Sequence, residues 1–276
     1  MALPRPLSIL AALLLTAVAC SAPRSELLDS PIVDELRQGW DSGDESFDHS
    51  SYTTLLQAHV DPDAGTVDYA GLADNANDLN AYLASLAAVD LTTLPRDEQL
   101  ALLINAYNAY TLRLILDHYP GIDSIRDISA PWTTERYDVG GYTLSLDQIE
   151  HNLIRPLYLD PRIHFVVNCA AVDCPHLADF AFTGADLEDQ LEDRTRAILS
   201  NPKFLRVEDG RLYLPKVMDW YQADFLSDEF HGSVDRLPEY VIPYATEEVR
   251  GFITSHDGNP PATFLDYDWS LNDTAQ

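Results

Sequence analysis

Lysine is almost absent from this sequence, and positive charge is scarce altogether. Only Lys203 and Lys216 occur, and the 17 Lys and Arg residues face 45 Asp and Glu residues, which gives a formal net charge of −28. A chain this acidic repels the phosphates of nucleic acids and anionic lipid headgroups. Nucleic acid is therefore disfavoured as a partner, and the carboxylate excess speaks for solubility rather than for an activity.

Long apolar runs are missing after the first twenty residues, since no later stretch reaches the ~18 apolar residues that a membrane helix needs. The one early run, residues 7–18, is too short for a permanent membrane helix; Arg5 precedes it and Ala19–Cys20 follow it. This pattern resembles a bacterial lipoprotein signal, in which Cys20 is lipidated and becomes the first residue of the mature chain. An ordinary cleaved secretory signal is the alternative.

We therefore expect residues 1–20 to be a lipoprotein signal peptide and the rest of the chain to be exported and anchored by lipid. Residues 21–50 are polar, acidic and interrupted by proline, which predicts a flexible tether. Residues 51–270 are long enough for one globular domain with its own core. No aspartate follows Cys20, which favours the periplasmic face of the outer membrane if the cell has two membranes.

Helical patterns dominate the first half of this domain. Residues 78–89 are amphipathic, and residues 96–122 form the strongest helical segment, with acidic residues at its start and Pro120 at its end. Asn105 and Asn108 lie three residues apart on this helix and so share one face. Because asparagine is unfavourable inside a helix, we expect these two side chains to bond to a neighbouring loop.

Hairpin patterns dominate the second half. Gly140–Gly141 and Asp209–Gly210 each separate two strand-like segments, and residues 262–273 predict a last strand. Ser145 begins a helix, with Gln148 completing a capping box. Helices followed by hairpins predict an α+β fold, with a mixed or antiparallel sheet and a long central helix.

Cysteine is rare, and two of the three cysteines stand close together in HFVVNCAAVDCPHL, residues 164–177. The segment reads as a strand from His164 that ends near Asn168. Strict alternation over five residues would place His164 and Cys169 on opposite faces, so they can meet only if the strand bulges or ends early. Cys169 and Cys174 are candidates for a disulfide, a reactive thiol with its neighbour, a redox pair, or buried free thiols.

A zinc site and the role of Glu150 also have to be considered. The histidines and cysteines of residues 151–176 lack the spacing of a standard zinc site, so we predict no metal and no cofactor. Glu150 aligns with Leu146 and Leu153 on the inward face of its helix, where a carboxylate must be paired. A structural salt bridge and a catalytic acid both fit. Trp220 and Tyr221 fit either the core or the wall of a cleft.

Four segments together resemble the bacterial family called domain of unknown function 547 over residues 50–245. They read INAYNAYTLRLILDHYPGIDSIRDI, GGYTLSLDQIEHNLIR, PRIHFVVNCAAVDCPHL and LPKVMDWYQADF.

This resemblance implies a fold similar to the papain and transglutaminase group of cysteine hydrolases. It also implies Cys169 as nucleophile, His164 as its base and Glu150 as the acid, with Cys174 as a rival nucleophile. One departure stands out, because the nucleophile of papain-like enzymes usually begins a long helix and here the long helix has no cysteine.

Two functions follow as hypotheses. The first is an envelope-anchored cysteine hydrolase or acyl transferase that acts on peptide or peptidoglycan amides. The second is a non-catalytic lipoprotein that binds a peptide or a protein partner and carries a Cys169–Cys174 disulfide.

Overall fold

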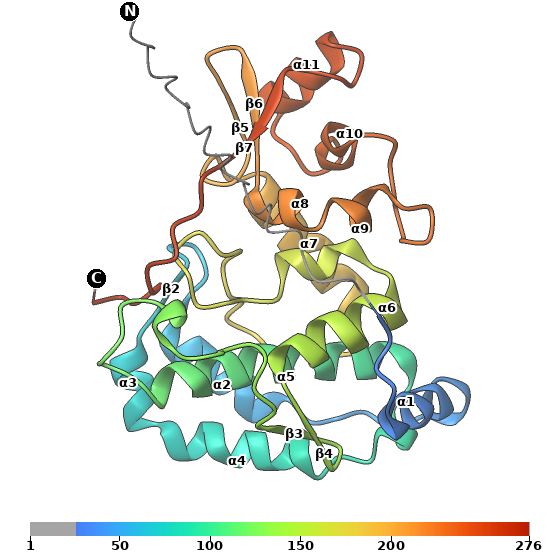
Figure 1. The fold of residues 1–276 in the computed structure, drawn as a ribbon, viewed down its shortest axis with the longest axis vertical. Coiled ribbons are helices and arrows are strands. Elements are labelled where there is room, and N and C mark those ends of the chain that lie inside the picture. The colour runs from blue at the N-terminus through green and yellow to red at the C-terminus, as the bar shows by residue number, and fades with distance from the viewer. Residues whose placement is uncertain (1–25, 276) are drawn as a thin grey trace, which may run out of the picture.

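The computed structural model describes residues 26–275, and it is a mixed α+β fold in which helices predominate (Figure 1). The α-helices are α1 (Pro31–Ser42), α2 (Ser50–His59), α3 (Tyr69–Asp74), α4 (Ala76–Ala87), α5 (Arg96–Leu116), α6 (Arg155–Tyr158), α7 (Leu187–Leu199), α8 (Lys216–Trp220), α9 (Gln222–Leu226), α10 (Leu237–Val241) and α11 (Glu247–Ser255). Three 3₁₀-helices, η1 (Leu91–Thr93), η2 (Ile125–Asp127) and η4 (Pro161–Phe165), and one π-helix, η3 (Gln148–Ile154), complete the helical elements of this part of the chain.

The strands form three small sheets among the described residues. They are β1 (Val60–Asp61) with β2 (Thr66–Val67), β3 (Tyr137–Val139) with β4 (Tyr142–Leu144), and β5 (Arg206–Glu208) with β6 (Arg211–Leu214) and β7 (Ala262–Phe264). The first two are antiparallel hairpins, and the third is mixed because β7 pairs parallel to β6. Both predicted hairpins are confirmed, whereas the last strand, predicted over residues 262–273, covers only Ala262–Phe264.

The predicted long central helix is confirmed as α5, which lies in the middle of the lower body in Figure 1. Every side chain from Glu98 to Leu112 is buried, as expected for a helix that other elements surround on all sides. Asp97 and Glu98 lie in its first turn, where carboxylates favour the helix dipole. The helix ends at Leu116, six residues before the predicted end. Because α5 is surrounded by other elements, it can fix the loops around residues 166–168 and 182 through its side chains.

The expected tether over residues 21–50 is wrong for its second half, which belongs to the globular body. Residues 31–42 form helix α1, and its side chains Ile32 and Leu36 are fully buried. Pro31 occupies the first turn of this helix, where its missing N–H costs nothing. The acidic composition suggested a tether because α1 is amphipathic. Its charged residues face solvent, and its few apolar residues pack into the core.

The predicted strand beginning at His164 is also wrong. Residues Pro161–Phe165 form the 3₁₀-helix η4, and the Asp160 side chain caps it by accepting from the Arg162 backbone N–H at 2.9 Å. Arg162 is held in turn by Asp160 and by Glu188 of α7. An apolar run that is buried on all sides has no two-residue alternation to read, so helix and strand cannot be told apart from it.

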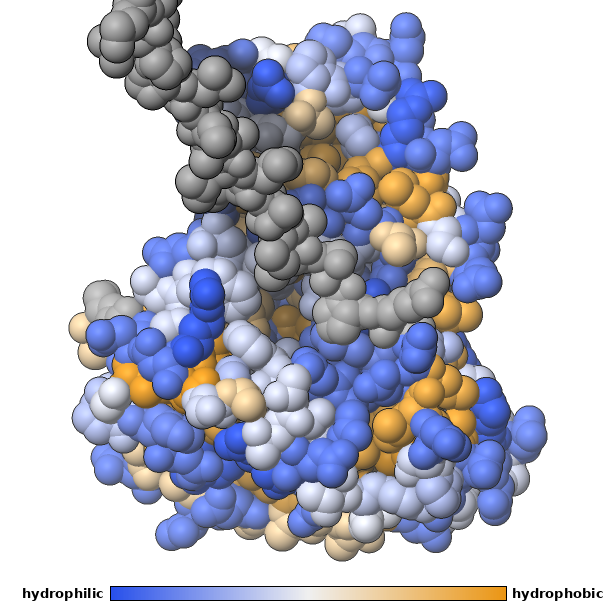
Figure 2. Space-filling model, viewed as in Figure 1, coloured by the Kyte–Doolittle hydropathy of each residue, from blue (hydrophilic) through white to orange (hydrophobic). Residues whose placement is uncertain are grey.

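Two hydrophobic clusters divide the molecule. The larger surrounds α5, and the smaller joins β5–β7 with α7–α11 in the upper lobe of Figure 1. Figure 2 shows a mostly hydrophilic surface on this face, with small apolar patches. Within residues 26–275, no helix has the length and apolarity to cross a bilayer. The predicted signal peptide and Cys20 lie outside the described residues.

Candidate active site

A cleft of about 490 Å³ gathers most of the candidate residues. Its walls come from the π-helix η3, the loop after η4, the end of α8 and the C-terminal segment. Three of the four tryptophans of the chain line it. The lining residues are Tyr107, Arg126, Trp132, Thr133, Asp147, Glu150, His151, His164, Val167, Cys169, Cys174, Pro175, Val217, Trp220, Tyr221, Tyr267 and Trp269.

The loop that carries the thiols turns sharply just after Asn168. The Asn168 side chain accepts from the Ala170 backbone N–H and donates to the Pro175 carbonyl, both at 2.8 Å. Ala170 adopts the left-handed conformation with φ of 62°. This turn brings the two ends of the loop together and places Cys169 beside Cys174.

The two cysteines are free thiols within hydrogen-bonding distance of each other. Their Sγ atoms lie 3.1 Å apart, and the Cys169 backbone N–H donates to Cys174 Sγ at 3.0 Å. Tyr267 Oη lies 3.1 Å from Cys169 Sγ. Cys169 is partly exposed to the cleft, whereas Cys174 is buried. Cys169 is therefore the more accessible of the two sulfurs.

The environment separates the acidities of these thiols. Hydrogen bonds with Cys174 and with Tyr267 hold the pKa of Cys169 below its usual range, although burial acts in the opposite direction. Burial, together with the nearby Cys169 sulfur, raises the pKa of Cys174 well above its usual range. A negative charge shared by the pair is therefore favoured on Cys169, and thiolate is the reactive form of cysteine.

His164 faces the same cleft and is oriented by Asp224. Its Nε2 lies 2.8 Å from Asp224 Oδ2, and its ring stacks on Tyr221 with centroids 3.9 Å apart. Nδ1 has no hydrogen-bond partner within residues 26–275, and the side chain is 1% exposed. Burial lowers the pKa of His164, against the effect of Asp224. If Nε2 carries the proton donated to Asp224, Nδ1 keeps a lone pair.

Asp224 is a partner that the sequence patterns did not single out. Arg155 donates two hydrogen bonds to its carboxylate, at 2.7 and 2.9 Å. Burial raises the pKa of Asp224, but the hydrogen bonds from Arg155 and His164 outweigh burial and hold this pKa at about 2. The only signal in the sequence was an acidic residue between Tyr221 and Phe225, in a segment otherwise typical of core.

Glu150 lies in the cleft and is paired, as expected for a buried carboxylate. Its Oε1 is 3.6 Å from His151 Nδ1, and burial together with the hydrogen bond to Glu150 raises the pKa of Tyr221. Glu150 faces inward as predicted, and the adjacent His151 does so too, because both are buried and both line the cleft. Both belong to a π-helix, whose wider turns change the spacing of neighbouring side chains.

Asn105 and Asn108 bond to neighbouring loops, as predicted. Asn108 donates to the Val166 carbonyl at 2.9 Å and accepts from the Asn168 backbone N–H at 2.8 Å. Asn105 exchanges the same two kinds of bond with the backbone of Phe182. Asn108 therefore fixes the segment between His164 and Cys169 to the central helix.

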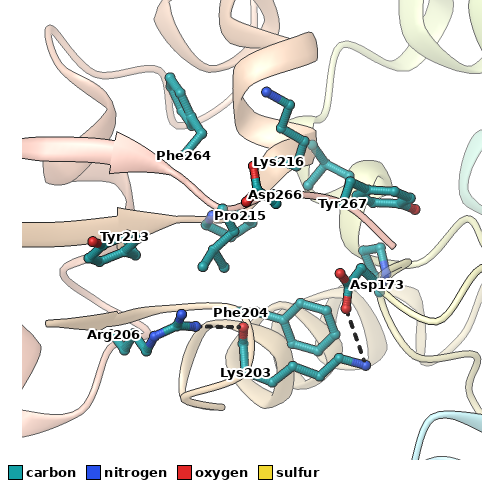
Figure 3. Close-up of a pocket in the computed structure, with 13 residues that line it drawn as sticks. Asp173, Lys203, Phe204, Arg206, Tyr213, Pro215, Lys216, Phe264, Asp266 and Tyr267 are labelled. Atoms are coloured by element: carbon teal, nitrogen blue, oxygen red, sulfur yellow. Dashed lines mark hydrogen bonds and ion pairs between the residues drawn. The ribbon is translucent and has the colours of Figure 1, made fainter. Parts of the chain in front are cut away.

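A second cavity, of about 400 Å³, shares Pro175, Val217 and Tyr267 with the cleft. Figure 3 shows residues that line it. Lys203, one of the two lysines, lies along its edge and reaches toward Asp173.

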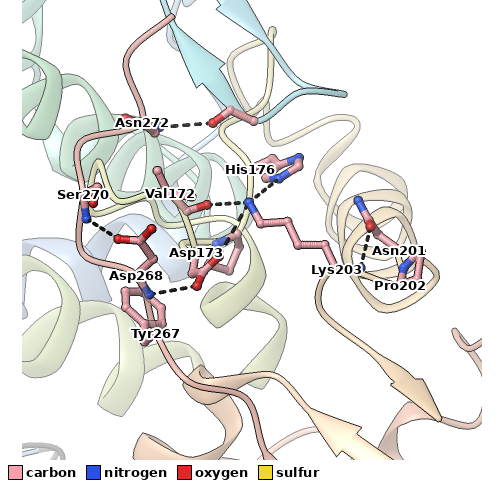
Figure 4. A network of polar contacts seen from close by, with 12 residues as sticks. Val172, Asp173, His176, Asn201, Pro202, Lys203, Tyr267, Asp268, Ser270 and Asn272 are labelled. Carbon is pink, nitrogen blue, oxygen red and sulfur yellow. Dashed lines mark hydrogen bonds and ion pairs between the residues drawn. The ribbon is translucent and has the colours of Figure 1, made fainter. Parts of the chain in front are cut away.

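Lys203 also contacts the loop that carries the two cysteines, residues 169–176. Its Nζ donates to the Val172 carbonyl at 2.6 Å and lies 3.5 Å from His176 Nε2 and 3.8 Å from Asp173 Oδ1 (Figure 4). Asp173 in turn accepts from the Asp268 backbone N–H at 2.8 Å. The loop around Cys174 is thus fixed to the C-terminal segment that carries Tyr267.

The structure thus brings Cys169, Cys174, His164 and Glu150 to one cleft, but it does not join His164 to Cys169 by a hydrogen bond. Among residues 26–275, no group of three His, Cys, Asp or Glu side chains is arranged to hold a metal ion.

The cleft brings thiols, an imidazole and carboxylates together, and part of the chain matches a known family. Residues 91–199 match the family model described as "Protein of unknown function, DUF547". The matched segment contains Cys169, Cys174, His164 and Glu150 and stops short of Asp224 and Tyr267. No curated protein and no solved structure matches the chain.

Proposed function

We propose that the protein is an exported, lipid-anchored cysteine hydrolase or acyl transferase that acts on peptide or peptidoglycan amides. The single observation that carries the catalytic part is the meeting, in one cleft, of an accessible low-pKa thiol with an imidazole that a buried carboxylate orients. In this proposal Cys169 is the nucleophile, His164 the base, and Asp224 takes the orienting role first given to Glu150.

The chemistry follows from these roles. His164 Nδ1 removes the thiol proton, and the Cys169 thiolate attacks the amide carbonyl carbon. The imidazolium then protonates the leaving amine, and the C–N bond breaks to leave an acyl thioester. Water, deprotonated by the same nitrogen, attacks the thioester, which releases a carboxylic acid and restores the thiol; an acceptor amine in place of water gives acyl transfer.

The pairing of His164 with Cys169 is expected to tighten when substrate fills the cleft, since catalytic hydrogen bonds are often long in empty sites. The relation to papain-like enzymes is proposed on the residue types alone. The nucleophile here follows a 3₁₀-helix rather than beginning the long helix α5.

The proposed anchor rests on the first twenty residues. A short apolar segment after Arg5 and a cysteine at position 20 have the form of a lipoprotein signal. Metabolic labelling with a fatty-acid analogue tests this part: the expected result is labelling of the natural chain and none of Cys20→Ala. Equal labelling of both would contradict the anchor and leave the catalytic proposal untouched.

Hydrolysis of peptidyl amides of 7-amino-4-methylcoumarin by the purified protein tests the catalytic part. We expect cleavage that Cys169→Ser abolishes and Cys174→Ser retains, because only Cys169 is accessible and acidic. One equivalent of iodoacetamide should abolish the same cleavage. Activity that survives Cys169→Ser would refute the assignment of the nucleophile.

The 3.1 Å separation of the two sulfurs favours a second candidate, a non-catalytic binding protein in which they form a disulfide. The mass of the protein purified from the cell envelope without reductant distinguishes the two. A mass two hydrogens short, with no alkylation of either cysteine, supports the binding protein.

A further inference from the structure

The cleft carries more negative than positive charge, and this excess lies on one wall. Asp147, Glu150 and Asp224 contribute three carboxylates at or beside the cleft, and Arg126 and Arg155 two guanidinium groups. Arg155 is committed to Asp224 by two hydrogen bonds. Arg126 lies over the ring of Trp269, with 5.3 Å between its Cζ and the ring centroid. Asp147 and Glu150 are the carboxylates whose ion-pair partner is a histidine, His151, and Glu150 also acts on the charge of Arg155.

His151 lies between these two carboxylates. Its Nε2 is 3.7 Å from Asp147 Oδ1 and its Nδ1 is 3.6 Å from Glu150 Oε1. Burial raises the pKa of Asp147, and the nearby Glu150 adds to this effect, while His151 opposes it. The Asp147 side chain is 31% exposed and lines the cleft, so a ligand can reach its carboxylate. The wall thus offers negative charge that a bound cation would stabilise.

Aromatic rings surround the same space. Trp132 is joined to Asp147 because the Asp147 backbone N–H donates to the Trp132 carbonyl at 3.0 Å. Trp220 and Tyr267 continue the wall through Trp269, whose ring centroid lies 5.6 and 4.6 Å from theirs. Aromatic faces attract ammonium groups, and the effect strengthens where water is excluded. Carboxylates within an aromatic enclosure are a combination suited to an organic cation.

A third, independent observation concerns His164. The residue is 1% exposed, lines the cleft and has Nδ1 without a partner among the described residues. With Nε2 paired to Asp224, this nitrogen is an acceptor, and the N–H of the amide that is to be cleaved can satisfy it until the proton transfer begins. An anionic ligand would instead meet Asp147 and Glu150 and the field of a chain with net charge −28.

We propose that the amide substrate carries a protonated primary amine, which Asp147 and Glu150 bind as counter-ions between Trp132, Trp220 and Tyr267. This inference rests on the proposed function for the amide bond and adds the charge of the group beside it. The substrate class is that of peptides with a lysine-like or other diamino residue next to the scissile amide.

Binding and cleavage are measured separately so that the two proposals can fail independently. Binding is followed by tryptophan fluorescence, since three of the four tryptophans line the cleft. The probes are N-acetyl-lysinamide, its nearly isosteric neutral analogue N-acetyl-norleucinamide, and the anionic N-acetyl-glutamic acid amide. Cleavage uses the coumarin amides of the same three acetylated residues.

We expect the lysine probe to bind at least about tenfold more tightly than the norleucine probe at low salt, and the glutamate probe to bind weakest. The preference should shrink in 1 M NaCl, because salt screens a partly exposed charge pair. Asp147→Asn should reduce the preference several-fold. Asp228→Asn removes the same charge from an exposed position away from the cleft and should leave the preference unchanged.

Each outcome decides one proposal. Preferential binding of the lysine probe without cleavage of any coumarin amide supports the amine site and refutes the hydrolase. Cleavage with equal affinities for the lysine and norleucine probes refutes the amine site and supports the hydrolase. An equal loss of preference in Asp147→Asn and Asp228→Asn refutes Asp147 as a counter-ion.

Discussion

The replacement Asp224→Asn tests the buried charge pair that orients His164. The substitution keeps the shape of the side chain and one acceptor oxygen, but it removes the counter-ion of Arg155. That guanidinium is 4% exposed and donates two hydrogen bonds to Asp224, at 2.7 and 2.9 Å. The variant therefore leaves a positive charge buried beside a neutral amide.

The size of the effect can be bounded in two ways. The drop of the Asp224 pKa from 3.8 to about 2 corresponds to roughly 2 kcal/mol of stability at neutral pH. Removal of one partner of a buried ion pair costs about 3–5 kcal/mol. Because the asparagine oxygen still accepts one hydrogen bond, we expect a loss of about 3 kcal/mol in the free energy of unfolding at pH 7.

The pH dependence has a definite sign. The pKa of Asp224 is lower in the folded than in the unfolded protein, so its contribution is complete above the unfolded value of 3.8 and is lost as the pH falls toward 2. Asparagine has no such contribution to lose. The stability gap between the natural protein and Asp224→Asn should therefore narrow by roughly 1 kcal/mol between pH 7 and pH 3.

Urea unfolding followed by circular dichroism measures both quantities. Asp228→Asn, an exposed acid-to-amide change, serves as control and should cost less than about 0.5 kcal/mol. A loss below about 1 kcal/mol for Asp224→Asn at pH 7, or a gap that stays constant down to pH 3, would contradict the buried pair.

Three further predictions concern the scaffold and the thiols. Leu36→Ala should lower the free energy of unfolding by about 2–5 kcal/mol, because Leu36 of α1 is fully buried. A loss under about 1 kcal/mol would contradict the packing of α1 into the core and favour a flexible tether instead. Asn108→Ala should cost about 2–4 kcal/mol in the same assay, since two buried backbone groups lose their partner; a neutral result would remove Asn108 as the clamp of the loop. Cys174→Ala should slow alkylation of Cys169 at pH 7 several-fold, because the hydrogen bond with Cys174 that lowers the pKa of Cys169 is lost. An unchanged or faster rate would contradict that role.

Local patterns predicted the elements that depend on neighbours in sequence. The Gly140–Gly141 hairpin and the capping box of Ser145 and Gln148 depend on contacts over a few residues, and both are present. The central helix α5 could also be predicted, since its apolar residues extend over many turns. The residues that determine such features lie within the features themselves, and local sequence patterns therefore predict them.

The missed features depend on distant partners. Asp224 joins His164 across 60 positions, and nothing near either residue announces the pair. Tyr267 reaches Cys169 across 98 positions. The 3₁₀-helix found in place of the strand predicted from His164 has a local cap, Asp160, but its Arg162 is also held by Glu188, 26 positions away. In each case tertiary contacts decide the local structure, and propensity is a weak guide there.

The charge state of Cys169 is the central claim, and its alkylation rate as a function of pH tests it most directly. The purified, reduced protein is treated with iodoacetamide from pH 5 to pH 10, and each cysteine is followed by peptide mass mapping. We predict that Cys169 reacts first and that its alkylation rate reaches half of its maximum at a pH below ~8.5, the pKa of an ordinary thiol. A midpoint at or above that value, or faster modification of Cys174, would contradict it.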